Sequence, residues 1–221
     1  PCGGFRADSA SLIRLKARRI QKWQVDKMNA EKYDPTALET GLIGGPEKRE
    51  LVIEDYNPDW PERFARHKDR IEPALSGLKP TVEHIGSTSV AGLPAKPIID
   101  ILLIVPDSAD EETYLPQLLT LGYQLRVREP DFNEHRMLRT PERDVHIHVF
   151  SAGNGEIDRY RLFRQHLQNN PDRLTAYAAL KRELAKKSWQ DMNEYADAKS
   201  GFIEEAIACE RKADVQKAGT R

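Results

Sequence analysis

An uninterrupted apolar run with one carboxylate inside it constrains the fold more than any other feature of the chain. Residues 98–105 read IIDILLIV, which has the length of a strand and no polar alternation. Such a run is typical of a strand that other elements cover on both faces. Asp100 is the exception, because a buried carboxylate is costly unless it is paired, hydrogen-bonded or bound to a metal. We therefore expect a functional site at Asp100 on a central strand.

A turn rich in glycine and hydroxyl groups precedes this run. Residues 81–85 read as a strand that leads through His84 into the turn. The turn consists of Gly86, Ser87, Thr88 and Ser89. Backbone N–H groups in such a turn suit a phosphate or carboxylate, so we predict that His84 and the turn contact substrate. A hydrolase triad of Ser87 or Ser89 with His84 and Asp100 is less favoured, because the GxSxG nucleophile motif is missing.

The periodicity of the remaining chain predicts a small mixed sheet with helices packed against it. Further strands are predicted over residues 51–53, 123–127, 134–139 and 145–150. Helices are predicted over residues 8–32, 59–77, 110–121, 156–168, 170–187 and 191–212. This order indicates an α/β (α+β) fold. We expect a helical extension and linker over residues 1–50, with the linker at 34–49, a core over 51–155 and a C-terminal helical subdomain over 156–221.

Histidines alternate with aliphatic residues in the last predicted strand. His146 and His148 share one face, and the residues between and beside them are valine and isoleucine. We expect the two histidines to form the wall of a pocket near Asp100 and to transfer protons. Zinc binding by the pair is less favoured because the sequence shows no third ligand, and two structural histidines are the other alternative.

Basic side chains near these strands are candidates for substrate contacts. His135 and Arg136 lie on the strand that precedes His146, and Lys96 lies just before Pro97. We expect Arg136 and Lys96 to bind anionic groups and His135 to join the pocket. A solvated loop position is an equally good interpretation of Lys96.

Two tyrosine–lysine pairs at i, i+4 spacing occur in the C-terminal helices. They are Tyr177 with Lys181, and Tyr195 with Lys199. Such pairs usually mark the edge of a core, with the lysine reaching solvent. The functional alternative is that these helices form the second wall of the cleft. Lys181 or Lys199 would then contact a phosphate, and a tyrosine such as Tyr177 would contact a base or side chain of the substrate.

Several motifs in sequence order resemble the GrpB family. They are DYNPDWP at 55–61, HIGSTSV at 84–90, GL at 92–93, KPIIDI at 96–101, HIHVF at 146–150 and YAALK at 177–181. The resemblance runs from about residue 51 to about residue 210. It implies the nucleotidyltransferase fold of the polymerase-β superfamily, in which a Gly-Ser turn holds a triphosphate. Two carboxylates at i and i+2 of the next strand hold Mg²⁺ in that fold, since i and i+2 share a face.

The chain departs from this pattern at the second carboxylate. Asp100 has the first position, but Leu102 occupies i+2. One carboxylate can still hold one Mg²⁺ together with waters and substrate phosphates. We therefore expect Mg²⁺ as the cofactor at Asp100, and no zinc.

The resemblance and the turn–carboxylate arrangement favour a transferase acting on a nucleotide or nucleotide-bearing substrate. One alternative, suggested by fungal relatives, is aminoacyl-tRNA-dependent amino-acid transfer that yields cyclodipeptides. A basic helix over residues 11–28 is compatible with tRNA phosphates, although its packing on the domain is the favoured interpretation. A ligand-binding module on a decayed catalytic fold is the third candidate.

Composition limits the partners further. The net charge is −1, so no overall field indicates binding to nucleic acid or membranes. No apolar run approaches the length of a membrane span. Cys2 and Cys209 lack the spacing of metal ligands, and we expect a reduced cytoplasmic protein. Oligomeric state does not follow from the sequence.

Overall fold

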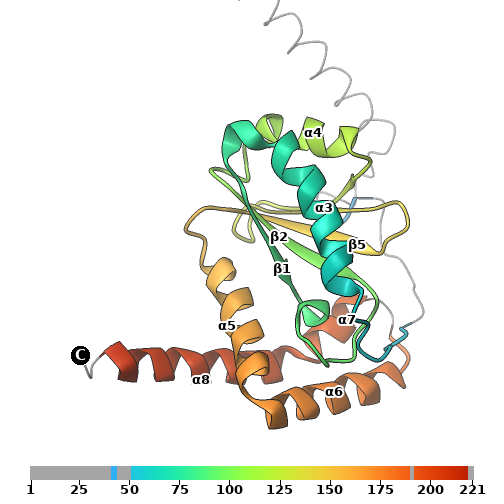
Figure 1. The fold of residues 1–221 in the computed structure, drawn as a ribbon, viewed down its shortest axis with the longest axis vertical. Coiled ribbons are helices and arrows are strands. Elements are labelled where there is room, and N and C mark those ends of the chain that lie inside the picture. The colour runs from blue at the N-terminus through green and yellow to red at the C-terminus, as the bar shows by residue number, and fades with distance from the viewer. Residues whose placement is uncertain (1–40, 44–50, 190–191, 219–221) are drawn as a thin grey trace, which may run out of the picture.

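A mixed five-stranded sheet is the centre of the described part of the chain. The computed structural model describes residues 41–43, 51–189 and 192–218. The strands are β1 (Thr81–Ile85), β2 (Ile99–Val105), β3 (Gln124–Glu129), β4 (His135–Arg139) and β5 (Val145–Ser151). Their order in the sheet is β1-β2-β5-β4-β3 (Figure 1). Strands β2 and β5 pair in parallel, and the other neighbouring strands pair antiparallel.

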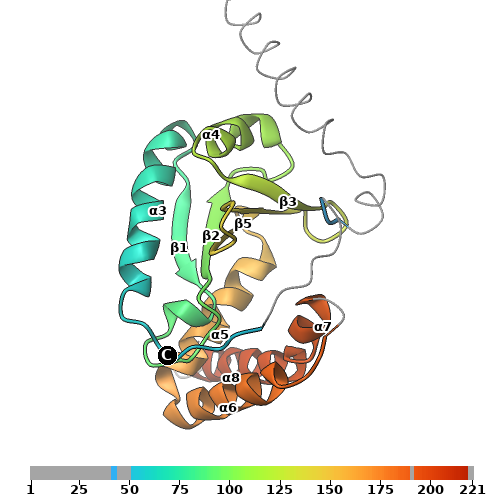
Figure 2. The same ribbon diagram turned by 90° about the vertical axis from the view of Figure 1, so that its right-hand side faces the viewer.

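Helices α3 (Trp60–Ala74) and α4 (Leu115–Thr120) cover one face of the sheet. The sheet residues buried under them alternate along the central strands, and include Ile99, Ile101 and Leu103 of β2 with Val145, Ile147 and Val149 of β5. Helix α5 (Gly155–Asn169) packs on the opposite face through Ile157, which joins a smaller cluster with Leu102 and Phe150. Figure 2 shows α3 and α5 on opposite sides of the sheet. This coverage explains why β2 is apolar on both faces.

The remaining helices gather at the end of the sheet where β2 begins (Figures 1 and 2). They are α6 (Pro171–Ala185), α7 (Met192–Asp197) and α8 (Ser200–Ala218). Tyr177 and Leu167 pack there against Val90 and Leu93, which follow the glycine–hydroxyl turn. The C-terminal helices are therefore anchored directly on the segment that we expect to bind substrate.

The predicted fold class is confirmed: a mixed sheet carries flanking helices and a group of C-terminal helices. Three boundaries differ. Residues 51–53 are not a strand, and a single bridge joins Glu54 to Ala95 instead. The helix predicted over 110–121 begins as a 3-10 turn, Glu111–Thr113, because Pro116 favours the first turn of a new helix. The last predicted helix is divided into α7 and α8. The subdomain boundary at residue 155 stays a prediction.

The N-terminal predictions fall mostly outside the described residues. The basic helix over residues 8–32 is one of them. Within the predicted linker, Gly41 accepts a hydrogen bond from the Arg128 amide, and Leu42 forms a bridge with Val127. This part of the linker therefore adds to the exposed edge of β3. Among the described helices, none combines the length and the hydropathy that crossing a bilayer requires.

Candidate functional site

Asp100 lies at the start of β2, on the face that α5 covers. Parallel pairing sets Asp100 beside His146 and Leu102 beside His148. Because side chains alternate along a strand, Asp100 and both histidines point to the same face. The Asp100 Oδ1 atom lies 3.6 Å from His146 Nδ1 and 3.8 Å from His148 Nε2. We call Asp100, His146 and His148 the Asp100 cluster; the structure brings together the three residues predicted to be catalytic.

The Asp100 side chain is 28% exposed, so its charge is only partly solvated. Burial raises its pKa, but the two imidazoles beside it oppose this and hold the pKa of Asp100 well below its ordinary value. The side chain is therefore a carboxylate at neutral pH.

Gly86 lets the turn approach Asp100 closely. Its φ is 70° and its ψ is −173°, a conformation available essentially to glycine alone. A Cβ atom at this position would lie 2.3 Å from Asp100 Oδ2. The glycine is therefore required twice, for the backbone conformation and for the space beside the carboxylate.

The three hydroxyls of the turn have different roles. The buried Thr88 hydroxyl donates to the carbonyl of Ile98, and the Ser89 hydroxyl donates to the carbonyl of Gly86 at 2.7 Å. These two side chains hold the turn in shape. Ser87, in contrast, lines a cavity next to Asp100.

His84 points to the face opposite Asp100. Its ring stacks on Phe64 of α3 at 4.8 Å, and its Nε2 lies 3.0 Å from Thr88 Oγ1. Since the Thr88 hydrogen is directed to Ile98, His84 must donate its Nε2–H to Thr88. Burial lowers the pKa of His84 to about 4, against a weaker opposing effect of Asp100. His84 therefore supports the turn from behind and does not line the cavity.

Arg136 also lies on the opposite face, which corrects its expected place in the cleft. Its position across from Val149 turns it towards α4. Its Nε donates to Glu111 at 2.6 Å, and Arg128 donates to the same carboxylate at 2.7 and 2.5 Å. We call Arg136, Glu111 and Arg128 the Arg136 cluster. Because a strand alternates, His135 and Arg136 had to face opposite sides.

His135 extends the Asp100 cluster away from the cavity. Its Nε2 lies 3.1 Å from His148 Nδ1, and its Nδ1 lies 2.7 Å from Glu129 Oε2. The two imidazole rings stack with centroids 5.4 Å apart. His135 is buried and does not line the cavity; its ring contacts His148 and Glu129.

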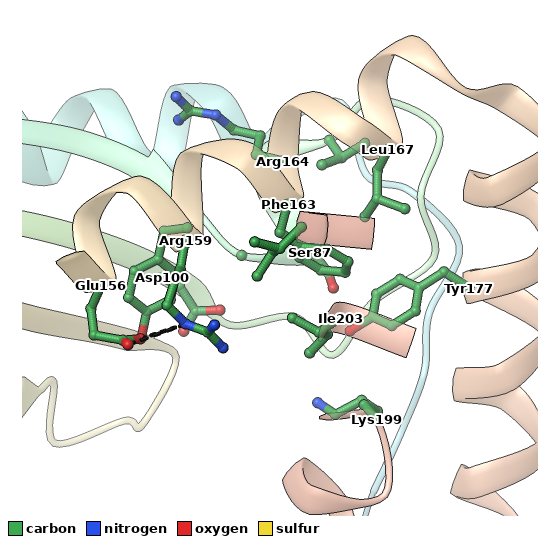
Figure 3. Close-up of a pocket in the computed structure, with 14 residues that line it drawn as sticks. Ser87, Asp100, Glu156, Arg159, Phe163, Arg164, Leu167, Tyr177, Lys199 and Ile203 are labelled. Atoms are coloured by element: carbon green, nitrogen blue, oxygen red, sulfur yellow. Dashed lines mark hydrogen bonds and ion pairs between the residues drawn. The ribbon is translucent and has the colours of Figure 1, made fainter. Parts of the chain in front are cut away.

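A cavity of about 260 Å³ opens beside Asp100, between the turn and helices α5, α6 and α8. Its walls are largely apolar and aromatic, and include Val90, Tyr160, Phe163, Leu167, Tyr177, Ile203 and Ile207. Figure 3 shows Asp100 at the left of the view, Ser87 near the centre and Lys199 below them. A small chemical group with an apolar part and an anionic part fits these walls.

Two of the three cations along the cavity are held by carboxylates. Arg159 pairs with Glu156 at 3.1 Å and also with Glu204. Arg164 donates to the carbonyl of His84 and, at 3.3 Å, to Glu83, and its guanidinium turns away from the other labelled side chains (Figure 3). Lys199 lies over the Tyr195 ring at 4.2 Å.

Of the two candidate lysines, Lys199 lines the cavity and Lys181 does not. The buried Lys181 amine donates to the carbonyl of Pro94 and does not line the cavity. Burial, with nearby Lys96, lowers the pKa of Lys199 to about 8. Lys96 itself lies 5.3 Å from the centre of the Tyr195 ring. Tyr177 lines the cavity as expected, and burial raises its pKa.

The α5 wall of the cavity was missing from the predicted site. It consists of Glu156, Arg159, Tyr160, Phe163, Arg164 and Leu167. Their spacing of three and four residues marks one helix face. The sequence could not indicate that this face meets Asp100, because the periodicity of a helix shows which residues share a face but not what that face packs against.

The Asp100 cluster offers ligands for one metal ion. One donor atom from each of Asp100, His146 and His148 lies within 4.8 Å of the other two. The spacing of the two histidines in the sequence did not reveal a third donor. The structure shows that this donor is Asp100, on the neighbouring parallel strand β2. The donor set does not match the carboxylate pair that holds Mg²⁺ in the resembled fold. The position of the second carboxylate is occupied by Leu102, which is fully buried in the apolar cluster.

Comparisons with known proteins agree with the motifs. Residues 50–208 match the family model described as GrpB protein. A UPF0157 protein from Streptomyces coelicolor is 51% identical over 170 residues, which cover 77% of this chain and 88% of that protein. A UPF0157 protein from Halalkalibacterium halodurans is 51% identical over 185 residues, covering 82% and 94%. The crystal structure of the conserved protein GrpB from Enterococcus faecalis is 33% identical, with a TM-score of 0.66 over 73% of this chain and 98% of that one. The chain belongs to the GrpB family.

Proposed function

We propose that the chain is a transferase acting on a nucleotide or nucleotide-bearing substrate, with Asp100 at the reaction centre. One observation carries this proposal: the Asp100 carboxylate lines a cavity that also contains the glycine–hydroxyl turn and a lysine. A carboxylate held in a partly buried site beside imidazoles has the surroundings of a reacting group. Structural carboxylates are usually saturated by hydrogen bonds instead.

The cavity suits part of a nucleotide-bearing substrate. Tyr160, Phe163 and Tyr177 provide aromatic surface for a base or another flat group. Lys199 offers a positive charge to an anionic group, and Ser87 lines the same cavity as Asp100. At about 260 Å³ the cavity would hold one moiety and leave the rest of a larger substrate outside.

The Asp100 cluster would act on protons and charge at the transferred group. Without a bound metal, His148 can accept a proton at Nε2, which faces Asp100, and release its Nδ1 proton to His135. Removal of such a group from a reaction centre costs about 100-fold or more in rate. The neutral amide of asparagine keeps the shape of Asp100 but not its charge.

The test uses cells that express the wild-type chain or Asp100→Asn. Mass spectrometry of small molecules and nucleotides should show a product that accumulates with the wild type and is at least about 100-fold lower with the variant. A matched Asp110→Asn variant, at an exposed position before α4, should behave as wild type. Equal product from Asp100→Asn and wild type would contradict the assignment.

A second candidate is aminoacyl-tRNA-dependent amino-acid transfer, with tRNA as partner. It is favoured by the buried Leu102, which occupies the position where two-metal nucleotidyl transfer needs a second carboxylate. Acyl transfer needs a base and an anion-binding surface, but no metal pair. Cyclic dipeptides among the accumulated products would support this candidate, and nucleotide adducts would support the first.

A further inference from the structure

We propose that Asp100, His146 and His148 form a binding site for a transition-metal ion of the Zn²⁺ type, in preference to Mg²⁺. The inference goes beyond the proposed function and does not depend on the substrate named there. It rests on the distances among the donor atoms, on their chemistry and on the groups that hold His148.

The distances are those of ligands around an ion and not those of hydrogen-bonded partners. Asp100 Oδ1 lies 3.6 Å from His146 Nδ1 and 3.8 Å from His148 Nε2. A charge-assisted hydrogen bond would bring such atoms to about 2.7–2.9 Å. Two ligand atoms at about 2.0–2.1 Å from a tetrahedral Zn²⁺ are roughly 3.4 Å apart. The two distances from Asp100 are thus slightly longer than those around a bound Zn²⁺, and all three donor atoms lie within 4.8 Å of one another.

The donor set selects against Mg²⁺. Imidazole nitrogens suit Zn²⁺ and related transition ions, whereas Mg²⁺ prefers carboxylates, carbonyls and water. Asp100 is the one carboxylate of the three ligands, and Leu102 removes the expected second carboxylate. The Mg²⁺ expected from the resemblance therefore fits these residues poorly.

A chain of hydrogen bonds prepares His148 for coordination through Nε2. Glu129 Oε2 can only accept from His135 Nδ1, at 2.7 Å, which makes His135 Nε2 an acceptor. His135 Nε2 then accepts the Nδ1–H of His148 at 3.1 Å, and the His148 Nε2 lone pair is left facing Asp100. Carboxylate–histidine support of this kind is typical of ligating histidines.

The ion would stand at the edge of the cavity. Asp100 lines the cavity, while both histidines approach from β5. Three protein ligands leave at least one coordination position for water or substrate. Gly86 keeps that side open, because any larger residue would meet Asp100 Oδ2.

The test is a calorimetric titration of chelator-treated protein with Zn²⁺ and with Mg²⁺, accompanied by Co²⁺ absorption spectra. We expect one Zn²⁺ per chain, bound on the order of 100-fold more tightly than Mg²⁺. His146→Gln and His148→Gln should each weaken Zn²⁺ binding by about 100-fold and alter the Co²⁺ spectrum. His135→Gln should weaken it by roughly 10–100-fold.

His67→Gln is the matched control. His67 lies on α3 and contacts Tyr123, on the other side of the sheet, so this variant should bind Zn²⁺ as the wild type does. Cooperative unfolding of each variant shows that it is folded. If His148→Gln does not fold, the comparison of His146→Gln with the wild type decides the test. Zn²⁺ binding no tighter than Mg²⁺ binding would overturn the proposal, as would full Zn²⁺ affinity in both ligand variants. Metal binding without a nucleotide-dependent product would uphold the site and contradict only the proposed function.

Discussion

The Arg136 cluster and the Asp100 cluster lie on opposite faces of the sheet, and they differ in their hydrogen bonding. In the Arg136 cluster, Glu111 accepts hydrogen bonds of 2.5–2.7 Å from Arg128 and Arg136. In the Asp100 cluster, the carboxylate stays 3.6 and 3.8 Å from its histidines. The Arg136 cluster is closed by its own hydrogen bonds, and the Asp100 cluster borders a cavity. The comparison suggests that the first cluster stabilises the fold and that the second is kept for a ligand.

The pKa values of the two carboxylates show why charge alone does not distinguish the clusters. Burial raises the pKa of Glu111, but the guanidinium groups of Arg128 and Arg136 reverse this and lower it. The imidazoles have the same net effect on Asp100. Both side chains are ionised at neutral pH, so the difference lies in the partners: guanidinium groups stay charged, whereas imidazoles can exchange protons or bind a metal.

The largest expected effect on stability comes from breaking the Arg136 cluster. Glu111→Ala leaves the Arg136 side chain, which is 6% exposed, without its closest carboxylate. The loss in free energy of unfolding should be about 3–5 kcal/mol. His146→Gln, in the Asp100 cluster, should cost about 1 kcal/mol or less. Urea unfolding of both variants measures the difference, and equal losses would remove the distinction between the clusters.

A smaller effect should follow from crowding Asp100. Gly86→Ala forces a Cβ atom to within 2.3 Å of Asp100 Oδ2 in a conformation that favours glycine, and should cost about 2 kcal/mol. Gly92→Ala is the matched control, because Gly92 also has a positive φ, of 77°, but nothing lies within 4 Å of the added atom. Thermal unfolding and Zn²⁺ titration of both variants test this. Metal binding should be lost in Gly86→Ala alone; unchanged binding there would argue against the tight fit.

His84 predicts a pH dependence that belongs to the fold and not to the site. Its folded pKa is about 4, below the ordinary value of 6.5, so the unfolded chain binds a proton first. Stability should therefore fall as the pH is lowered from about 6.5 towards 4, by on the order of 1–2 kcal/mol. His84→Gln should flatten the dependence of the unfolding free energy over this range. An unchanged slope would show that the histidine titrates normally.

Lys199 should give the smallest effect, in the same direction as His84 but at higher pH. Its folded pKa of about 8 lies below the ordinary value of 10.5, so the folded chain loses the proton first. Stability should rise as the pH increases from about 8 to 10.5, by on the order of 1 kcal/mol. Lys199→Met should remove this rise, whereas Lys187→Met, at an exposed position, should keep it. Melting temperatures across this range decide the point.

Much of the fold could be predicted because it depends on local patterns. The apolar run of β2, the alternation of β5 and the proline at the first turn of α6 each indicate an element without reference to the rest of the chain. The division between α7 and α8 could not be read in this way, since the pattern continues across residues 198–199.

The sequence predicted which site residues share a face only where these residues lie on the same strand. Alternation grouped His146 with His148, but their union with Asp100 depends on the parallel register of β2 and β5, which joins segments more than forty residues apart. The same alternation places His84 and Arg136 on the face of the sheet opposite Asp100. The family resemblance could not reveal which face they occupy. Lys199 and Lys181 have identical spacing from a tyrosine, and only packing decides which of them meets the cavity.

The most direct measurement is the free energy of unfolding of wild type and Asp100→Asn, each in chelator and each with Zn²⁺. If Asp100 is kept for a ligand, the two proteins should differ by about 1 kcal/mol or less in chelator. Zn²⁺ at 100 times its Kd should then add about 2.7 kcal/mol to the wild type and almost nothing to the variant. A loss of about 3 kcal/mol or more in chelator, with equal responses to Zn²⁺, would show that Asp100 is a structural carboxylate like Glu111 and would contradict the account.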